Sequence, residues 1–207
     1  MISLFGDTVP AEVIVACSGG VDSMFAAHFL AQKKYRSVHL LFVHHRTEAS
    51  EEALNFLERH ALGETGAKSF AVEYINSKAP ESSKEEFWRN ERYRIFKAMR
   101  TPVVTAHHLD DCMETYLFGA LNGTPKVIPY RHANVIRPFL LTRKEQMISW
   151  CNRKGVQWID DKSNMDTKYK RNQIRHNLMP EALKVNPGLD KVVARKVETD
   201  SIAYSTY

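Results

Sequence analysis

The residues that most directly suggest chemistry form a short run, Ser18-Gly19-Gly20-Val21-Asp22-Ser23, between an apolar segment and an amphipathic one. Two glycines let the backbone turn tightly and approach an anion. The hydroxyls of Ser18 and Ser23 can donate hydrogen bonds, and the N–H groups that begin the following helix carry partial positive charge. The run therefore predicts a phosphate-binding loop. The alternative is a glycine turn followed by ordinary helix capping by Ser or Asp.

A second set of chemical residues follows the apolar segment 102–106. Asp111 and Glu114 are three residues apart, so on a helix they share a face and both carboxylates can project into one cleft. Such a pair would bind magnesium or an ammonium group. Helix capping by Asp110 and Asp111 explains one acid but leaves His107, His108 and Glu114 without a role. A zinc site of His, Asp and Glu is the other possibility that these residue types allow.

Arginines at helical spacing form two further candidates. Glu85, Arg89 and Arg92 fall on one helical stripe, and Arg171 and Arg175 are four residues apart and face one way. Arginine binds carboxylates and phosphates in bidentate fashion. A surface salt-bridge ladder is the alternative for the first group, and exposed ion pairs for the second. Positive charge at a helix start opposes the helix dipole, however, so the second pair needs a partner.

The elements that position these residues alternate between strands and helices. The apolar and β-branched runs predict strands, and the amphipathic stretches predict helices. The strands are expected at 12–17, 37–43, 68–75 and 102–106, and the helices at 21–34, 50–63, 83–100, 142–155 and 172–183. This alternation predicts an α/β fold with a doubly wound parallel sheet, in which ligands bind beyond the carboxyl ends of the strands.

The phosphate loop resembles the signature of the PP-loop ATP pyrophosphatase superfamily. It has neither the Gly-Lys-Ser/Thr of the Walker loop nor a G-x-G-x-x-G pattern. The resemblance implies a Rossmann-like fold of the adenine nucleotide alpha hydrolase type. It also implies that ATP is cleaved to AMP and pyrophosphate, with adenylate passed to a substrate oxygen. The residues expected to bind ATP are Ser18, Gly19, Gly20, Val21, Asp22 and Ser23, together with His107.

Three further segments are similar to the tRNA(Ile)-lysidine synthetase family: 105–115, 85–94, and a third that runs through 137–140 and 158–164 to 171–175. This resemblance implies ligation of L-lysine to the wobble cytidine of tRNA(Ile) with a CAU anticodon, using ATP and magnesium. The implied catalytic residues are Asp22, Asp111, Glu114, Arg92, Arg171 and Arg175. The implied substrate-binding residues are Glu85, Arg89, Arg92, Asp111 and Glu114, and the implied magnesium ligands are Asp22 and Asp111.

The length and the charge distribution of the chain limit its possible domain organisation and partners. The 207 residues suit one catalytic domain over 1–183 and a short helical tail over 184–207. The net charge of +5 lies entirely in the second half, which suits an RNA partner or simply a solvated basic face. Because the family usually continues into further domains, tRNA binding is expected to use the basic second half, a homodimer or a helper protein.

Other classes remain as alternatives. No long apolar run or signal peptide occurs, so a cytoplasmic protein without a membrane span is expected. The three cysteines are scattered, which favours reduced thiols. A PP-loop cytidine thiolase is the nearest alternative enzyme, although the paired Cys-x-x-Cys motifs of that group are missing. A catalytically silent RNA-binding relative is the alternative from a different class.

Overall fold

The computed structural model describes residues 2–6, 9–32, 36–77, 79–80, 84–160 and 170–204. Within these ranges it does not describe the side chains of Glu85 and of residues 201–204. Residues 161–164, which carry part of the third family-like segment, lie outside the described residues.

A six-stranded sheet forms the centre of the molecule, in the order β3-β2-β1-β4-β6-β5. All neighbouring strands are parallel except the hairpin of β5 and β6. The strands are β1 (Glu12–Ala16), β2 (Ser37–His44), β3 (Ser69–Tyr74), β4 (Val103–Val104), β5 (Arg131–His132) and β6 (Val135–Ile136). The four strands expected from the sequence are confirmed, although β4 is only two residues long. The β5–β6 hairpin was not predicted.

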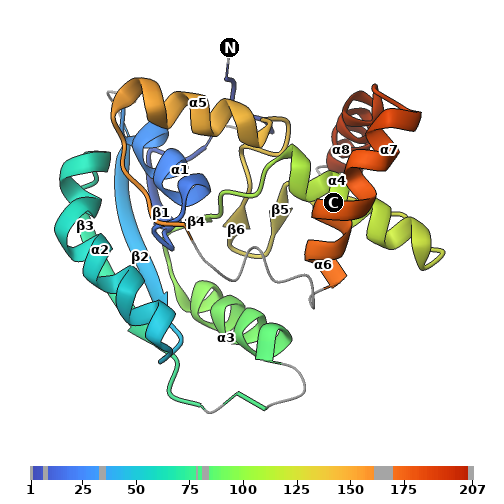
Figure 1. Ribbon diagram of the computed structural model, residues 1–207. Helices are drawn as coiled ribbons and strands as arrows, with labels where there is room; N and C mark the ends of the chain where they lie inside the picture. The colour runs from blue at the N-terminus through green and yellow to red at the C-terminus, as the bar shows by residue number, and fades with distance from the viewer. Residues whose placement is uncertain are drawn as a thin grey trace.

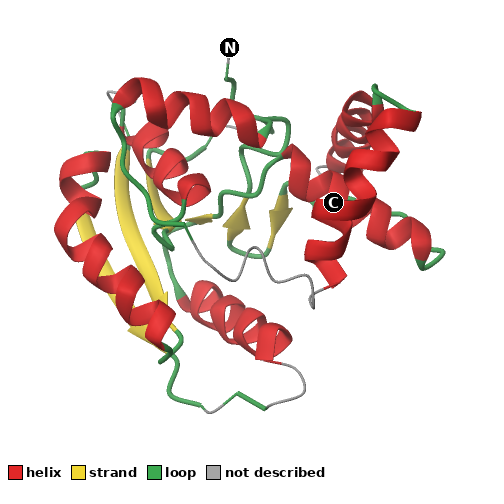
Figure 2. Ribbon diagram, in the orientation of Figure 1, coloured by secondary structure: helices red, strands yellow, loops and turns green. Residues whose placement is uncertain are grey.

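Helices cover both faces of this sheet, as Figures 1 and 2 show. On one face lie α1 (Val21–Ala31), α2 (Glu48–Thr65) and α5 (Lys144–Lys154), and on the other lies α3 (Lys84–Ala98). Alternate residues of β1 explain the two layers. Val13 and Val15 belong to the core around α1, whereas Ile14 packs against the core beneath α3. The predicted doubly wound α/β fold is confirmed.

The remaining helices stand together beside β5 and β6 (Figure 1). They are α4 (Leu109–Leu121), α6 (Lys170–Gln173), the π-helix η2 (Ile174–Leu178), α7 (Met179–Val185) and α8 (Leu189–Tyr204). The segment expected as a helix over 172–183 is helical but contains the π turn, which ends directly before α7, whose second residue is Pro180. Proline has no N–H and crowds the carbonyl four residues earlier, so the regular hydrogen-bond ladder cannot continue through it.

The predicted helical extension is present as α8. Its residues Val193 and Val197 are fully buried and belong to the same core cluster as Val13 of β1. The division of the chain at residue 183 stays a prediction. All three cysteines are free and buried, and burial raises the pKa of Cys112 to about 12.

Candidate functional site

The predicted phosphate loop connects β1 to α1 and is held in shape by its own hydrogen bonds. Ser23 Oγ accepts from the Ser18 N–H at 3.1 Å and donates to the Gly20 carbonyl at 2.9 Å. Gly19 has φ +85°, a conformation that favours glycine. Within the described part of the chain, no side chain caps the N-terminus of α1. The first N–H groups of the helix have no partners within the helix itself, as an anion site requires, and Ser18 before them is exposed.

The segment that follows α5 crosses this loop. The N–H of Ile159 donates to the Gly19 carbonyl at 3.0 Å. A Cβ added at Gly19 would approach the Ile159 side chain to 3.3 Å. The third family-like segment therefore reaches the loop at the last residues before the described chain is interrupted at 161.

His108 joins the loop to the acidic helix α4. Its Nε2 lies 3.6 Å from Asp22 Oδ2 and 3.6 Å from Asp111 Oδ2, so the two carboxylates are neighbours. His108 is also the N-cap of α4, where its N–H donates to Asp111 Oδ2 at 3.1 Å. Asp111 thus caps the helix and faces the loop at the same time. The sequence pattern left His108 unexplained and without an assigned role, because its contact with Asp22 joins residues far apart in the chain.

The charges of this cluster support one another. Burial alone would raise the pKa of Asp22, but the hydrogen bond and positive charge of His108, together with Lys144, lower it. Burial likewise acts against ionised Asp111, and His108, His107 and Arg175 lower its pKa. The pKa of His108 is raised despite its burial, because Asp111 and Asp22 flank the ring. Two ionised carboxylates are therefore maintained beside the loop.

The arrangement fits a divalent cation. Asp22 Oδ1 is buried without a hydrogen-bond partner, which leaves an oxygen available for a metal. Among the residues described, no group of three or more His, Cys, Asp or Glu side chains is arranged to hold a metal ion. Asp22 and Asp111 would hold magnesium only together with phosphate oxygens and water, as is usual for magnesium at nucleotide sites.

Glu114 lies one helical turn beyond Asp111 and is 1% exposed. Arg175 donates to it in bidentate fashion, at 2.5 Å to Oε1 and 3.1 Å to Oε2, and lies 3.5 Å from Asp111 Oδ1. Arg171 approaches the same carboxylate at 3.8 Å and donates to Thr115 at 3.3 Å. Burial raises the pKa of Glu114, and both guanidinium groups offset part of that rise. The prediction that the two arginines face one way is confirmed, and their partners are carboxylates.

The two arginines predicted to share a stripe on α3, Arg89 and Arg92, have different surroundings. Arg92 lies 3.4 Å from His45 Nε2, just beyond the carboxyl end of β2, and the His45 ring stacks on Trp88. Burial and the charge of Arg92 lower the pKa of His45 to about 4. Arg89 is exposed and lies over the Tyr93 ring at 5.0 Å. Glu85 is in α3, but its side chain lies outside the description.

His107 is expected to stay neutral at physiological pH. Its Nδ1 lies 2.9 Å from Thr105 Oγ1, and burial lowers its pKa to about 4 although Asp111 acts in the opposite direction. Because the unfolded chain takes up this proton near pH 6.5 and the folded chain only near pH 4, stability should rise with pH across that interval. An NMR titration of the ring should give the lowered pKa. His107→Gln should flatten the pH dependence of the melting temperature between pH 4 and 6.5. A ring that titrates near 6.5 would contradict this expectation.

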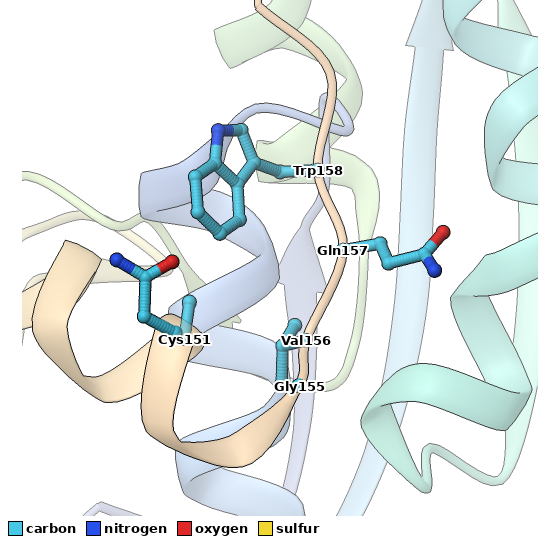
Figure 3. A pocket seen from close by; sticks show the side chains of 6 residues that line it. Cys151, Gly155, Val156, Gln157 and Trp158 are labelled. Carbon is cyan, nitrogen blue, oxygen red and sulfur yellow. The ribbon is translucent and has the colours of Figure 1, made fainter.

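An open pocket lies at the opposite end of α5 from Lys144. Figure 3 shows that the side chains of Gln157 and Trp158 leave the segment after α5 on opposite sides. The lining residues are Cys151, Asn152, Gly155, Val156, Gln157 and Trp158. None of them carries a formal charge, so this pocket offers a phosphate neither a cation nor a magnesium-binding acid.

A phosphate loop at the carboxyl end of the first strand of a doubly wound sheet, faced by two acids, defines a nucleotide-binding α/β domain. The chain belongs to the PP-loop domain family, an ATP-binding family that it matches over residues 2–182.

Similar proteins are consistent with this assignment. A tRNA(Ile)-lysidine synthase of Lactiplantibacillus plantarum is 34% identical over 199 residues, which cover 88% of this chain and 44% of that protein. A tRNA(Ile)-lysidine synthase of Thermosipho africanus is 34% identical over 204 residues, covering 90% and 47%. This chain spans about half the length of the curated relatives that it matches.

Among solved structures, the NH3-dependent NAD synthetase of Campylobacter jejuni has a TM-score of 0.48 and 13% identity, over 93% of this chain and 86% of that one. In the part of the chain that the structure describes, no helix is long and apolar enough to cross a membrane.

Proposed function

We propose that this protein activates the wobble cytidine of tRNA(Ile) with ATP and then joins L-lysine to it. The relatives named tRNA(Ile)-lysidine synthase, at 31–34% identity, support the substrate pair. The observation that carries the proposal is a pair of carboxylates beside the predicted phosphate loop. Arg175 contacts both Asp111 and Glu114 of α4, and His108 joins Asp111 to Asp22 of the loop.

The proposed reaction has two steps. In the first, the cytidine O2 attacks the α-phosphate of ATP, the bond to the β-phosphate breaks and pyrophosphate leaves. In the second, the side-chain amine of lysine attacks the activated C2, AMP leaves with the oxygen, and the amine loses a proton. Magnesium, when bound, would neutralise phosphate charge and orient the leaving pyrophosphate.

The chain itself supplies positioning and charge. Ser18 and the N-terminus of α1 bind the pyrophosphate portion, and Asp22 lies in the first turn of the same helix. Asp111 and Glu114 bind the lysine amine and accept its proton. An ammonium group that enters this site competes with the guanidinium of Arg175 for the Glu114 carboxylate. Arg175 and Arg171 are thereby released toward the phosphates, the role that their family-like motif implies.

The RNA would bind across the basic second half of the chain. An anticodon loop suits the site because its bases are single-stranded and can be turned out of the stack at low cost. Salt dependence follows from this model, since phosphate contacts release counterions. Raising the salt from 50 to 200 mM should therefore weaken tRNA binding by a large factor.

The direct test is lysine incorporation. The protein is incubated with ATP, magnesium, labelled L-lysine and a tRNA(Ile) transcript with a CAU anticodon, and label retained on the RNA is measured. We expect incorporation that needs all four components and is lost in Asp111→Ala, with Asp200→Ala, which removes an acid paired with Lys196 on α8, as the control. Pyrophosphate release on adding RNA, without incorporation of lysine, would favour another PP-loop base modifier such as a cytidine thiolase. RNA binding without ATP turnover would favour the silent relative.

A further inference from the structure

Lys144 has an unexplained position at the start of α5. Its Nζ lies 3.3 Å from Oδ2 of Asp22 in the phosphate loop, a residue 122 positions earlier in the chain. The side chain of Lys144 is 35% exposed, and that of Asp22 is 33% exposed. An ammonium group therefore stands at the opening of the loop, beside the carboxylate that is suited to a cation.

The backbone at this position is firmly anchored. The N–H of Lys144 donates to Asp110 Oδ2 at 2.8 Å, and Arg143 donates to both oxygens of Asp110 at 3.2 and 3.3 Å. Arg143 also reaches Asp190 of α8 at 3.3 Å. Three helices, α4, α5 and α8, thus fix the main chain of Lys144. Its four-carbon side chain alone has to move for the ammonium to change partners.

The contact with Asp22 is not needed to hold α5 against α1. Trp150 of α5 packs on Phe29 with ring centroids 4.9 Å apart, and Met147 and Cys151 are fully buried in the same core. A partly exposed ion pair adds little to such packing. The contact does place the Lys144 ammonium on Oδ2 of Asp22, where another cation could replace it. The other oxygen of this carboxylate, Oδ1, is buried without a hydrogen-bond partner.

We propose that Lys144 is a phosphate-binding residue of this site and holds the β- and γ-phosphates of ATP, and afterwards the pyrophosphate. This inference rests on the ATP chemistry of the proposed function. Like charges repel, so a divalent cation at Asp22 displaces the ammonium from Oδ2. The phosphate oxygens that accompany such a cation are the nearest new acceptors. Lys144 thus neutralises Asp22 when the loop is empty and binds the anion when it is filled.

Replacing Lys144 should weaken the binding of some ligands and not of others. Lys144→Met should weaken binding of inorganic pyrophosphate and of α,β-methylene ATP about tenfold or more, the usual loss for one hydrogen bond between charged groups. Binding of AMP, which lacks the β- and γ-phosphates, should change by less than about twofold, within the ordinary effect of a distant charge. Lys144→Arg should retain a large part of the affinity because it keeps the positive charge.

Titration calorimetry on the full chain with magnesium measures these affinities, and thermal melting verifies that each variant is folded. Lys154→Met is the matched control, since Lys154 ends the same helix and its ammonium lies over the Trp150 ring. Unchanged or tighter pyrophosphate binding by folded Lys144→Met would overturn the proposal. A parent protein that binds neither pyrophosphate nor α,β-methylene ATP would also overturn it. A parent protein that binds pyrophosphate and α,β-methylene ATP but incorporates no lysine would contradict the proposed function without contradicting the role of Lys144.

Discussion

Replacing Glu114 by alanine is expected to lower the free energy of unfolding by about 2–4 kcal/mol, near the range for breaking a buried ion pair. The carboxylate of Glu114 is 1% exposed and is the bidentate partner of Arg175. The alanine variant leaves the guanidinium without this partner. The expected loss is smaller than for a fully buried pair because the Arg175 side chain is 26% exposed and can reach water.

Removing the other partner should cost less. In Arg175→Met the carboxylate of Glu114, whose pKa is already raised by burial, can take up a proton and become neutral. The folded chain then binds this proton more tightly than the unfolded chain, so the variant should be less destabilised at pH 5 than at pH 7. Glu114→Ala has no such acid and should show no comparable recovery.

Urea denaturation of the parent and both variants at pH 5 and pH 7 measures these differences. Glu181→Ala is the matched control, because Glu181 forms an exposed ion pair with Lys184 on α7. Its effect should stay within about 0.5 kcal/mol, as for most surface pairs. A Glu114→Ala variant as stable as this control would show that the buried ion pair contributes nothing to the fold.

The fold could be predicted where a local pattern determined it. The apolar runs at 12–17 and 37–43 are long and β-branched, and the turn at Ser18–Ser23 separates strand from helix by its glycines. The hairpin of β5 and β6 carries no such signal, because each strand has only two residues and the pairing is defined by neighbours in the sheet. The π turn before Pro180 likewise depends on how proline is accommodated within an established helix.

In the candidate site, too, local spacing could be predicted from the sequence and long-range contacts could not. Helical spacing correctly brought Asp111 and Glu114 to one face, where Arg175 contacts both. Arg171 and Arg175 have a carboxylate partner, but Arg175 lies in the π turn after α6, where the argument from the start of a helix does not apply. The identity of that partner, Glu114, could not be read from the sequence because the contact spans 61 residues. The bridging position of His108 and the reach of Lys144 to the loop are tertiary contacts of the same kind.

Asp22→Asn is expected to reduce pyrophosphate release by about 10²–10³-fold, the usual effect of losing one group that stabilises charge in the transition state. The amide has the volume of the carboxylate but no negative charge. It therefore cannot hold a divalent cation at the buried Oδ1 position, nor draw the ammonium of Lys144 and the ring of His108 toward the loop. Because Asp22 helps to raise the pKa of His108, that pKa should fall in the variant.

Asp200→Asn separates this loss from a general effect of removing one negative charge. Asp200 is 33% exposed, as is Asp22, and it pairs with Lys196 on α8 rather than with the residues that anchor Lys144. This control should release pyrophosphate at close to the parental rate. Release is measured with a coupled phosphate assay over a series of magnesium concentrations. If Asp22→Asn regained the parental rate at high magnesium, Asp22 would contribute only affinity for the cation. If the rate stayed low at saturation, its charge would be needed while the phosphate bond breaks, as a site complementary to the transition state requires.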